Sequence, residues 1–297
     1  MHQLIPNYAK GLKCLKCSNI IINLQAGQLI RYLMSELEPC PHCNTHLNLF
    51  NIISNCIEEN FFFTDVFEFV NANTSIIQFT LKPASVITIT FEEYGIPKGS
   101  RILQINYTPE MGGLYPLEWH GNTPFRLAPR DFVTLYPAQF CDSTPSDTKV
   151  NMMITWIESG SLEDASLRSL VDAFQEYSLQ DFDTCIVPAN TAIEFDTMQY
   201  IENALEAVSS KNNIKEFFKG GVSYVPSLKI VIPLIAKTKN FPTMPEQLLT
   251  SLVALASLRN QIAHTGKTKA PLSKEQVAKC LSGVILGKWY IRELRKI

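Results

Sequence analysis

The chain has 297 residues, of which 46% are apolar and 18% charged, and its formal net charge is −2. This composition supports a buried core and excludes a disordered chain, and the length favours two or three domains. No apolar run approaches the roughly 20 residues of a membrane-spanning helix, and the N-terminus lacks the apolar stretch of a secretory signal. We therefore expect a cytoplasmic protein without a membrane partner.

Two matched CxxC pairs lie near the N-terminus and together provide four thiol groups: Cys14, Cys17, Cys40 and Cys43. Each pair forms a tight knuckle that directs both sulfurs to one side, so the two pairs can surround one tetrahedral ion. Thiolates favour Zn²⁺, and four of them leave no open position for water. The spacing thus predicts a structural zinc ribbon over residues 1–55.

Two alternatives to a four-cysteine zinc site can be weighed from the same segment. His42 and His46 are possible substitute ligands, but we expect them to be spectators because four cysteines suffice. A redox-active CxxC fits less well, since thioredoxin-like chemistry uses one such pair between a strand and a helix.

The remaining cysteines are scattered along the chain: Cys56, Cys141, Cys185 and Cys280. A secreted disulfide scaffold would be short and uniformly rich in cysteine, and this chain is neither. The pattern predicts buried thiols that behave as small apolar side chains in a reducing cytosol.

Residues 56–158 carry the pattern of an antiparallel β domain. The segments 85–91, 101–107 and 150–157 are rich in β-branched residues or alternate polar with apolar ones. Glycine and proline separate the first two segments, and no helical pattern lies between any of them. We therefore predict a small sandwich or barrel.

From residue 159 to 297 the apolar period becomes helical, which predicts a C-terminal helical bundle. A first helix follows the start signals around Ser161, and Pro188 is expected in the first turn of a second helix that runs to about residue 208. The stretch 228–236 contains Pro233, which leaves its state open between helix and loop.

The last two helices have clear boundaries in the sequence. Residues 242–245 open the first of them, and Gly266 is expected to end it as the C′ residue. Ser273 and Gln276 form a capping box that opens the final helix. The predicted fold class is thus a multidomain α+β protein with a zinc ribbon, a small antiparallel β domain and a helical bundle.

Positive charge is concentrated at the C-terminal end of the chain. Residues 201–297 hold 15 Lys and Arg against 6 Asp and Glu, whereas the first 200 hold 11 against 22. Four basic residues share one face of the final predicted helix: Lys288, Arg292, Arg295 and Lys296. Three lysines precede or open that helix: Lys267, Lys269 and Lys274. Together they can guide an RNA backbone, although a solvated helix face is an equally good interpretation.

The helix that ends at Gly266 places Arg259 in the middle of its apolar stripe, formed by Leu248, Leu252, Leu255 and Ile262. A guanidinium in that position needs a partner, because an unpaired buried charge is costly. The partner can be a carboxylate, helix-end carbonyls or an external phosphate. Geometry alone favours a core carboxylate such as Glu194, with His264 an ordinary residue at a helix end.

The string Arg259-Asn260-x-x-x-His264, followed by a glycine turn and a final amphipathic helix, resembles the HEPN superfamily. The hallmark of that family is Arg, four to six residues and His, and the resemblance covers about residues 160–297. It implies a small helical bundle, usually a homodimer and often a metal-independent endoribonuclease, with Arg259, Asn260 and His264 as the catalytic residues. Such proteins often act as defence effectors against phage. The alternative is a non-catalytic HEPN-like module for dimerisation and for nucleic-acid binding or sensing.

The chemistry of RNA cleavage fits these residue types. The substrate supplies its own nucleophile, the 2′-OH, so the enzyme needs a proton carrier such as His264 and a cation such as Arg259 for the phosphate oxygens. Two such motifs across a dimer axis would supply both a base and an acid. Arg259 and His264 lie about 140° apart on an ideal helix. We therefore expect either that the helix ends near Ala263 or that a partner subunit completes the site.

Overall fold

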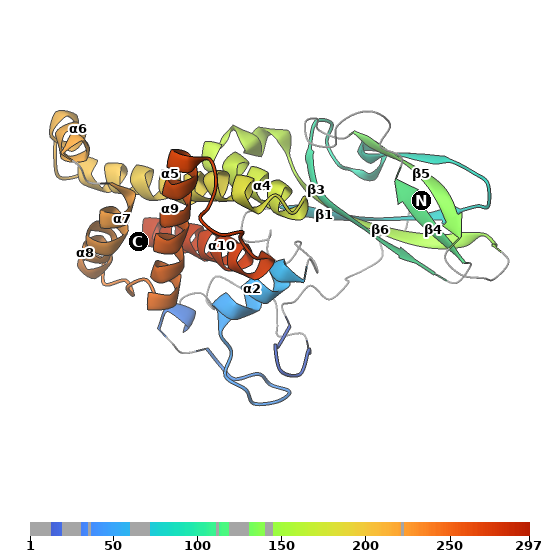
Figure 1. Cartoon of the computed structure of the whole chain (residues 1–297), viewed down its shortest axis with the longest axis horizontal. Helices are drawn as coiled ribbons and strands as arrows, with labels where there is room; N and C mark the ends of the chain where they lie inside the picture. The colour runs from blue at the N-terminus through green and yellow to red at the C-terminus, as the bar shows by residue number, and fades with distance from the viewer. Residues whose placement is uncertain are drawn as a thin grey trace. The chain divides into compact units, whose positions relative to one another are not determined.

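The computed structural model of the chain describes residues 13–19, 31–34, 37–59, 72–110, 113–118, 131–139, 145–220 and 223–297. These residues fall into two compact units (Figure 1), one within Asn71–Glu163 and one that joins Ala9–Val70 to Asp164–Ile297. The first unit contains the strands, and the second contains the four-cysteine segment and all α-helices described. The fold is thus mixed α+β, while the three-module boundaries at residues 55 and 158 stay a prediction.

The strand unit consists of two three-stranded antiparallel sheets, in the orders β1-β6-β3 and β2-β5-β4. The strands are β1 (Asn73–Leu81), β2 (Ile87–Thr90), β3 (Arg101–Pro109), β4 (Leu114–Glu118), β5 (Phe132–Gln139) and β6 (Thr148–Ile157). Alternate residues of both sheets, such as Leu81, Leu135 and Met152, are fully buried in one shared core. The predicted small antiparallel sheets are therefore confirmed, while a separate domain over residues 56–158 stays a prediction. Two short 3₁₀ turns follow β2 and β6, at Phe91–Tyr94 and Ser159–Glu163.

The helical unit is built around α10 (Figure 1), most of whose residues are buried. Its helices are α2 (Leu49–Glu58), α4 (Ala165–Ser178), α5 (Phe182–Glu206), α6 (Lys211–Lys219), α7 (Tyr224–Pro226), α8 (Ile232–Thr238), α9 (Glu246–Thr265) and α10 (Lys274–Lys296). Helices α2, α5 and α9 pack against α10. Two glycines of α10 permit this close approach. A Cβ on Gly283 would lie 2.5 Å from Ser251 Oγ, and one on Gly287 would lie 3.1 Å from Ile193 Cδ1.

The predicted boundaries of the last two helices are confirmed. Gly266 adopts φ of 77°, and its N–H donates to the carbonyl of Ile262 at 2.8 Å, so it ends α9. The hydroxyl of Ser273 accepts from the N–H of Gln276, whose side chain accepts from the N–H of Ser273, which completes the capping box of α10.

The predicted start of the second helix is wrong. Helix α5 begins at Phe182, capped by the Asp181 carboxylate, and Pro188 lies inside it. An interior proline removes the hydrogen bond to the carbonyl four residues earlier and costs about 3 kcal/mol. Burial of its neighbours Ile186 and Ala189 offsets that cost.

The stretch around Pro233 is helical, with an irregularity. One π turn, Ser227–Val231, precedes α8. A widened turn just before a proline makes room for the ring. It also accommodates the helical hydrogen bond that proline, which lacks an N–H, cannot donate.

Among the described residues, no single helix has the length and apolar character needed to cross a bilayer. One strongly bent pair, Lys211–Lys219 with Tyr224–Thr238, meets that test when both members are counted together, on length and composition alone.

Candidate metal centre and the polar cluster on α9

The four predicted cysteines converge in the helical unit. The sulfur of Cys14 lies 3.6 Å from that of Cys43, and the sulfur of Cys17 lies 3.7 Å from that of Cys40. All four sulfurs lie within 4.8 Å of one another, and they form the one such group of potential metal ligands in the described part of the chain. Four thiolates at about 2.3 Å from a tetrahedral zinc ion would be about 3.8 Å apart. The cluster can therefore hold one such ion.

The two knuckles repeat the same backbone pattern. Cys14 accepts at its carbonyl from the N–H of Ser18 at 2.9 Å, and Cys40 accepts from the N–H of Asn44 at 2.8 Å. Ser18 and Asn44 both adopt positive φ, of 57° and 55°. This tight turn, made twice, brings two distant segments into matched positions, and it explains why the motif alone predicted the cluster.

Hydrogen bonds within the knuckles favour the ionised sulfurs that a metal needs. Backbone N–H groups of Cys17 and Lys16 lower the pKa of Cys14, and the hydroxyl and N–H of Thr45 lower the pKa of Cys43 to about 6. The N–H of Asn19 also lowers the pKa of Cys17, but desolvation and the neighbouring sulfurs outweigh it and raise that pKa to about 11. Desolvation and the neighbouring sulfurs thus disfavour the thiolate of Cys17, and a bound divalent cation would offset both effects.

The other cysteines and the nearby histidines lie outside this cluster. His42 and His46 are exposed and are not among its members. Cys185 and Cys280 are buried, as predicted, and Cys56 is half-buried, whereas Cys141 lies outside the described residues.

Arg259 is held by two oxygen acceptors on the surface of the helical unit. Its Nη2 lies 3.2 Å from Glu194 Oε2, and its Nη1 donates to Asn260 Oδ1 at 3.0 Å. The pairing with Glu194 that geometry favoured is confirmed. The guanidinium is not deeply buried, however, because the Arg259 and Glu194 side chains are 37% and 31% exposed. External anions can therefore reach it.

Asn190 forms a hydrogen bond with the carboxylate of this ion pair, a contact that the sequence analysis did not predict. Its Nδ2 donates to Glu194 Oε2 at 2.7 Å, one helical turn away on α5. Asn190 is 1% exposed, and its Oδ1 has no partner among the described residues. Tyr224 on α7 is also buried, and burial together with the Glu194 carboxylate raises its pKa. The i, i+4 spacing of Asn190 and Glu194 was the available sequence signal.

His264 lies exposed in the last turn of α9. The helix stays regular through Thr265, so it does not end near Ala263. Arg259 and His264 are therefore about 140° apart around the axis and about 7.5 Å apart along it. A single chain brings Arg259 and Asn260 together but leaves His264 on another face.

The loop after α9 places two lysines beside this helix end. Thr268 is buried, and its hydroxyl donates to Asp183 Oδ1 on α5 at 2.8 Å. Lys267 and Lys269, on either side of this anchor, are exposed. The surface around His264 is therefore basic, which suits a polyanion.

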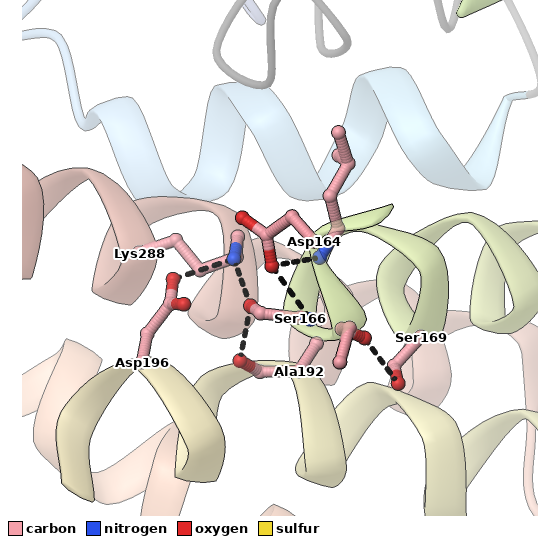
Figure 2. Close-up of polar contacts among 8 residues, drawn as sticks. Asp164, Ser166, Ser169, Ala192, Asp196 and Lys288 are labelled. Atoms are coloured by element: carbon pink, nitrogen blue, oxygen red, sulfur yellow. Dashed lines mark hydrogen bonds and ion pairs between the residues drawn. The ribbon is translucent and has the colours of Figure 1, made fainter. Parts of the chain in front are cut away.

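The predicted basic face of α10 is wrong for Lys288, while Arg295 and Lys296 are exposed. Lys288 has a side chain only 12% exposed, and Figure 2 shows its ammonium between Asp196 of α5 and Ser166 of α4. The Lys288–Asp196 distance is 2.5 Å. Farther along α10, Arg292 and Lys296 approach the buried Glu293 at 3.5 and 2.8 Å. Sequence periodicity shows which residues share a helix face but not what covers it.

The contact between Lys288 and Ser166 is structural and does not make a reactive serine. Ser166 is fully buried and donates to the carbonyl of Ala192 at 2.7 Å (Figure 2). The same hydroxyl accepts from the Lys288 ammonium, which also donates to Asp196, so both side chains are used within the fold. A Ser–Lys hydrolase is thereby excluded at this position.

Comparison with known proteins adds no relative, because no family model, curated protein or solved structure matches the chain.

Proposed function

We propose that the chain is a metal-independent endoribonuclease of the HEPN type, with a site completed across a homodimer. The observation that carries the proposal is the accessible guanidinium of Arg259, bonded to Asn260 and located on the helix whose last turn presents His264. Lys267 and Lys269 extend the positive surface toward a nucleic-acid backbone.

In the proposed reaction, His264 of one subunit removes the proton from the substrate 2′-OH, and the oxygen attacks the adjacent phosphorus. His264 of the other subunit protonates the departing 5′-oxygen. The two copies of Arg259 stabilise the charge on the non-bridging oxygens. The products are a 2′,3′-cyclic phosphate and a 5′-hydroxyl, and no metal takes part.

Glu194 and Asn260 have supporting roles in this proposal. Arg259 offers five N–H donors and uses one on each of these two residues. The remaining donors can therefore reach a phosphate while Glu194 still orients the side chain. Because Glu194 also neutralises part of the charge, it weakens binding of the RNA backbone.

The cysteine cluster is proposed to hold structural zinc. Its four sulfurs would close the coordination shell, so the ion would not contact substrate. A cytoplasmic location belongs to the same proposal and rests on the scattered cysteines, which are typical of a reducing compartment. A role as an effector against phage rests on the HEPN resemblance.

A non-catalytic role in dimerisation and nucleic-acid binding is the second candidate. The observation that favours it is the Arg259–Glu194 pair together with the position of His264 on another face of α9. Under this alternative the basic surface binds RNA, but no proton carrier reaches the phosphate.

Cleavage of RNA by wild type and by His264→Ala separates the two candidates. Assays run in EDTA, with bound zinc measured before and after, should show cleavage by wild type and none by the variant. His46→Ala, which changes another exposed histidine, serves as the matched control and should retain full activity. RNA that is bound but not cut by wild type would support the binding module instead.

The assembly is tested separately by light scattering. The proposal requires a homodimer at micromolar concentration, formed through residues 160–297. A strictly monomeric protein would remove the composite site.

A further inference from the structure

The first turn of α9 is clamped to the start of α2 by a single glutamine. Gln247 accepts at Oε1 from Asn48 Nδ2 at 3.0 Å and donates from Nε2 to Asn51 Oδ1 at 2.9 Å. Asn48 is also the N-cap of α2, since its Oδ1 accepts from the N–H of Asn51 at 3.0 Å. Both polar ends of Gln247 are therefore used on one turn of α2.

The start of α9 has no cap of its own. Its N-cap position is Pro245, which makes no capping hydrogen bond through its side chain. A helix end without a cap frays more readily. The contact between Gln247 and α2 thus supplies positional restraint that α9 itself lacks.

In sequence, Asn48 and Asn51 follow shortly after the last cysteine of the metal centre. Four residues separate Cys43 from Asn48, and the second knuckle fixes two of them. Asn44 donates to the carbonyl of Cys40 at 2.8 Å, and Thr45 accepts from the N–H of Cys40 at the same distance. Three steps from Thr45 to Asn48 span at most about 10 Å. Movement of the knuckle would therefore shift the N-cap of α2.

The rest of α2 is seated firmly. Leu49, Ile53 and Ile57 are buried, and the Tyr177 hydroxyl donates to the carbonyl of Ile57 at 3.2 Å. Loss of metal would thus leave the apolar face of α2 packed, so the disturbance is directed to the exposed side chains of Asn48 and Asn51.

We propose that the four-cysteine centre controls the first turn of α9 through the Asn48–Gln247–Asn51 clamp. Metal binding would thereby stabilise the start of the helix that carries Arg259. The ion concerned is a thiolate-binding divalent cation such as zinc. This coupling does not depend on the ribonuclease activity.

Hydrogen exchange of the amides at 249–252 measures the coupling directly. In the zinc-loaded protein, Gln247→Ala should increase exchange there about tenfold, while Gln261→Ala, the same change at the far end of α9, should leave it unchanged. Removing zinc from wild type should produce a similar increase, and removing it from Gln247→Ala should add little. Independent, additive effects would overturn the coupling.

If the zinc-free protein unfolds, the coupling can be measured in the other direction, from the clamp to the metal centre. Coupling acts in both directions, so Gln247→Ala should bind zinc several-fold more weakly than wild type or Gln261→Ala in a competition titration with a chromogenic chelator. Equal zinc affinities in all three proteins would overturn the proposal.

Discussion

The cysteine centre and the α9 motif differ in whether the residues of each motif come close together in the folded chain. Two CxxC pairs, separated by 22 residues, bring four sulfurs within 4.8 Å of one another. Arg259 and His264 are only five positions apart, yet a straight helix holds them on different faces. A knuckle turn directs both of its side chains inward, whereas helical periodicity separates residues i and i+5. Two residues spaced i and i+5 on a regular helix therefore need another structural element or another subunit to form one site.

Loss of one cysteine should have the largest effect. Cys40→Ser should lower zinc from about one ion per chain to near zero and unfold the N-terminal segment, because metal binding supplies folding free energy. Elemental analysis and thermal melting measure the two effects. Cys56→Ser, outside the cluster, is the matched control and should keep its zinc. A wild-type protein purified without zinc would contradict the metal assignment.

Changes at Arg259 should come next. Arg259→Ala should lower RNA cleavage at least a hundredfold, and Arg259→Lys should not restore it, because an ammonium cannot reproduce a two-pronged contact. Asn260→Ala should have a milder effect, since Asn260 orients the guanidinium. Single-turnover rates with folding checked by circular dichroism provide the measurement. Full rescue by lysine would show that charge alone is required.

The largely buried ion pair between Lys288 of α10 and Asp196 of α5 tests which basic residues are structural. Lys288→Met should lower the free energy of unfolding by about 3 kcal/mol, because it leaves the largely buried Asp196 without its partner. Lys279→Met, which breaks the exposed pair with Glu275 on the same helix, should cost no more than about 0.5 kcal/mol. Chemical denaturation measures both. If both variants lost the same small amount of unfolding free energy, Lys288 would belong to a solvated helix face that RNA can reach.

The smallest expected effect concerns Glu194. Glu194→Gln keeps the shape but removes the charge that competes with phosphate, so RNA affinity should rise about twofold to fivefold. Fluorescence anisotropy with 2′-O-methyl RNA, which the proposed enzyme cannot cut, provides the test. Glu202→Gln, at an exposed site on the same helix, is the control. Unchanged affinity in Glu194→Gln would place RNA away from Arg259.

Local signals in the sequence were sufficient where one turn determines the outcome. The cysteine knuckles, the Gly266 cap and the Ser273 capping box were all predicted because each depends on a few adjacent residues. Pro188 does not mark the start of α5, because the Asp181 carboxylate caps the helix earlier and core packing tolerates a proline inside it. The burial of Lys288 could not be predicted, since it depends on Asp196 and Ser166, which are distant in the sequence.

The same limit applies to the candidate site. The pairing of Arg259 with Glu194 could be proposed because the apolar stripe required a partner. The hydrogen bond from Asn190 to Glu194 follows from their i, i+4 spacing, but the position of this pair beside Arg259 depends on how α5 is oriented against α9, which no local pattern encodes. Whether a second chain completes the site depends on an interface that lies beyond one subunit.

The central claim is most directly tested with RNA oligonucleotides that differ at a single 2′ position. Wild-type protein should cut all-ribose RNA and leave a 2′,3′-cyclic phosphate, identified by mass spectrometry. A 2′-deoxy or 2′-O-methyl substitution at the cut site should block cleavage there, because the nucleophile is removed. Equal cleavage of the 2′-deoxy substrate or of DNA would contradict the proposed mechanism and leave the nucleic-acid-binding module in its place.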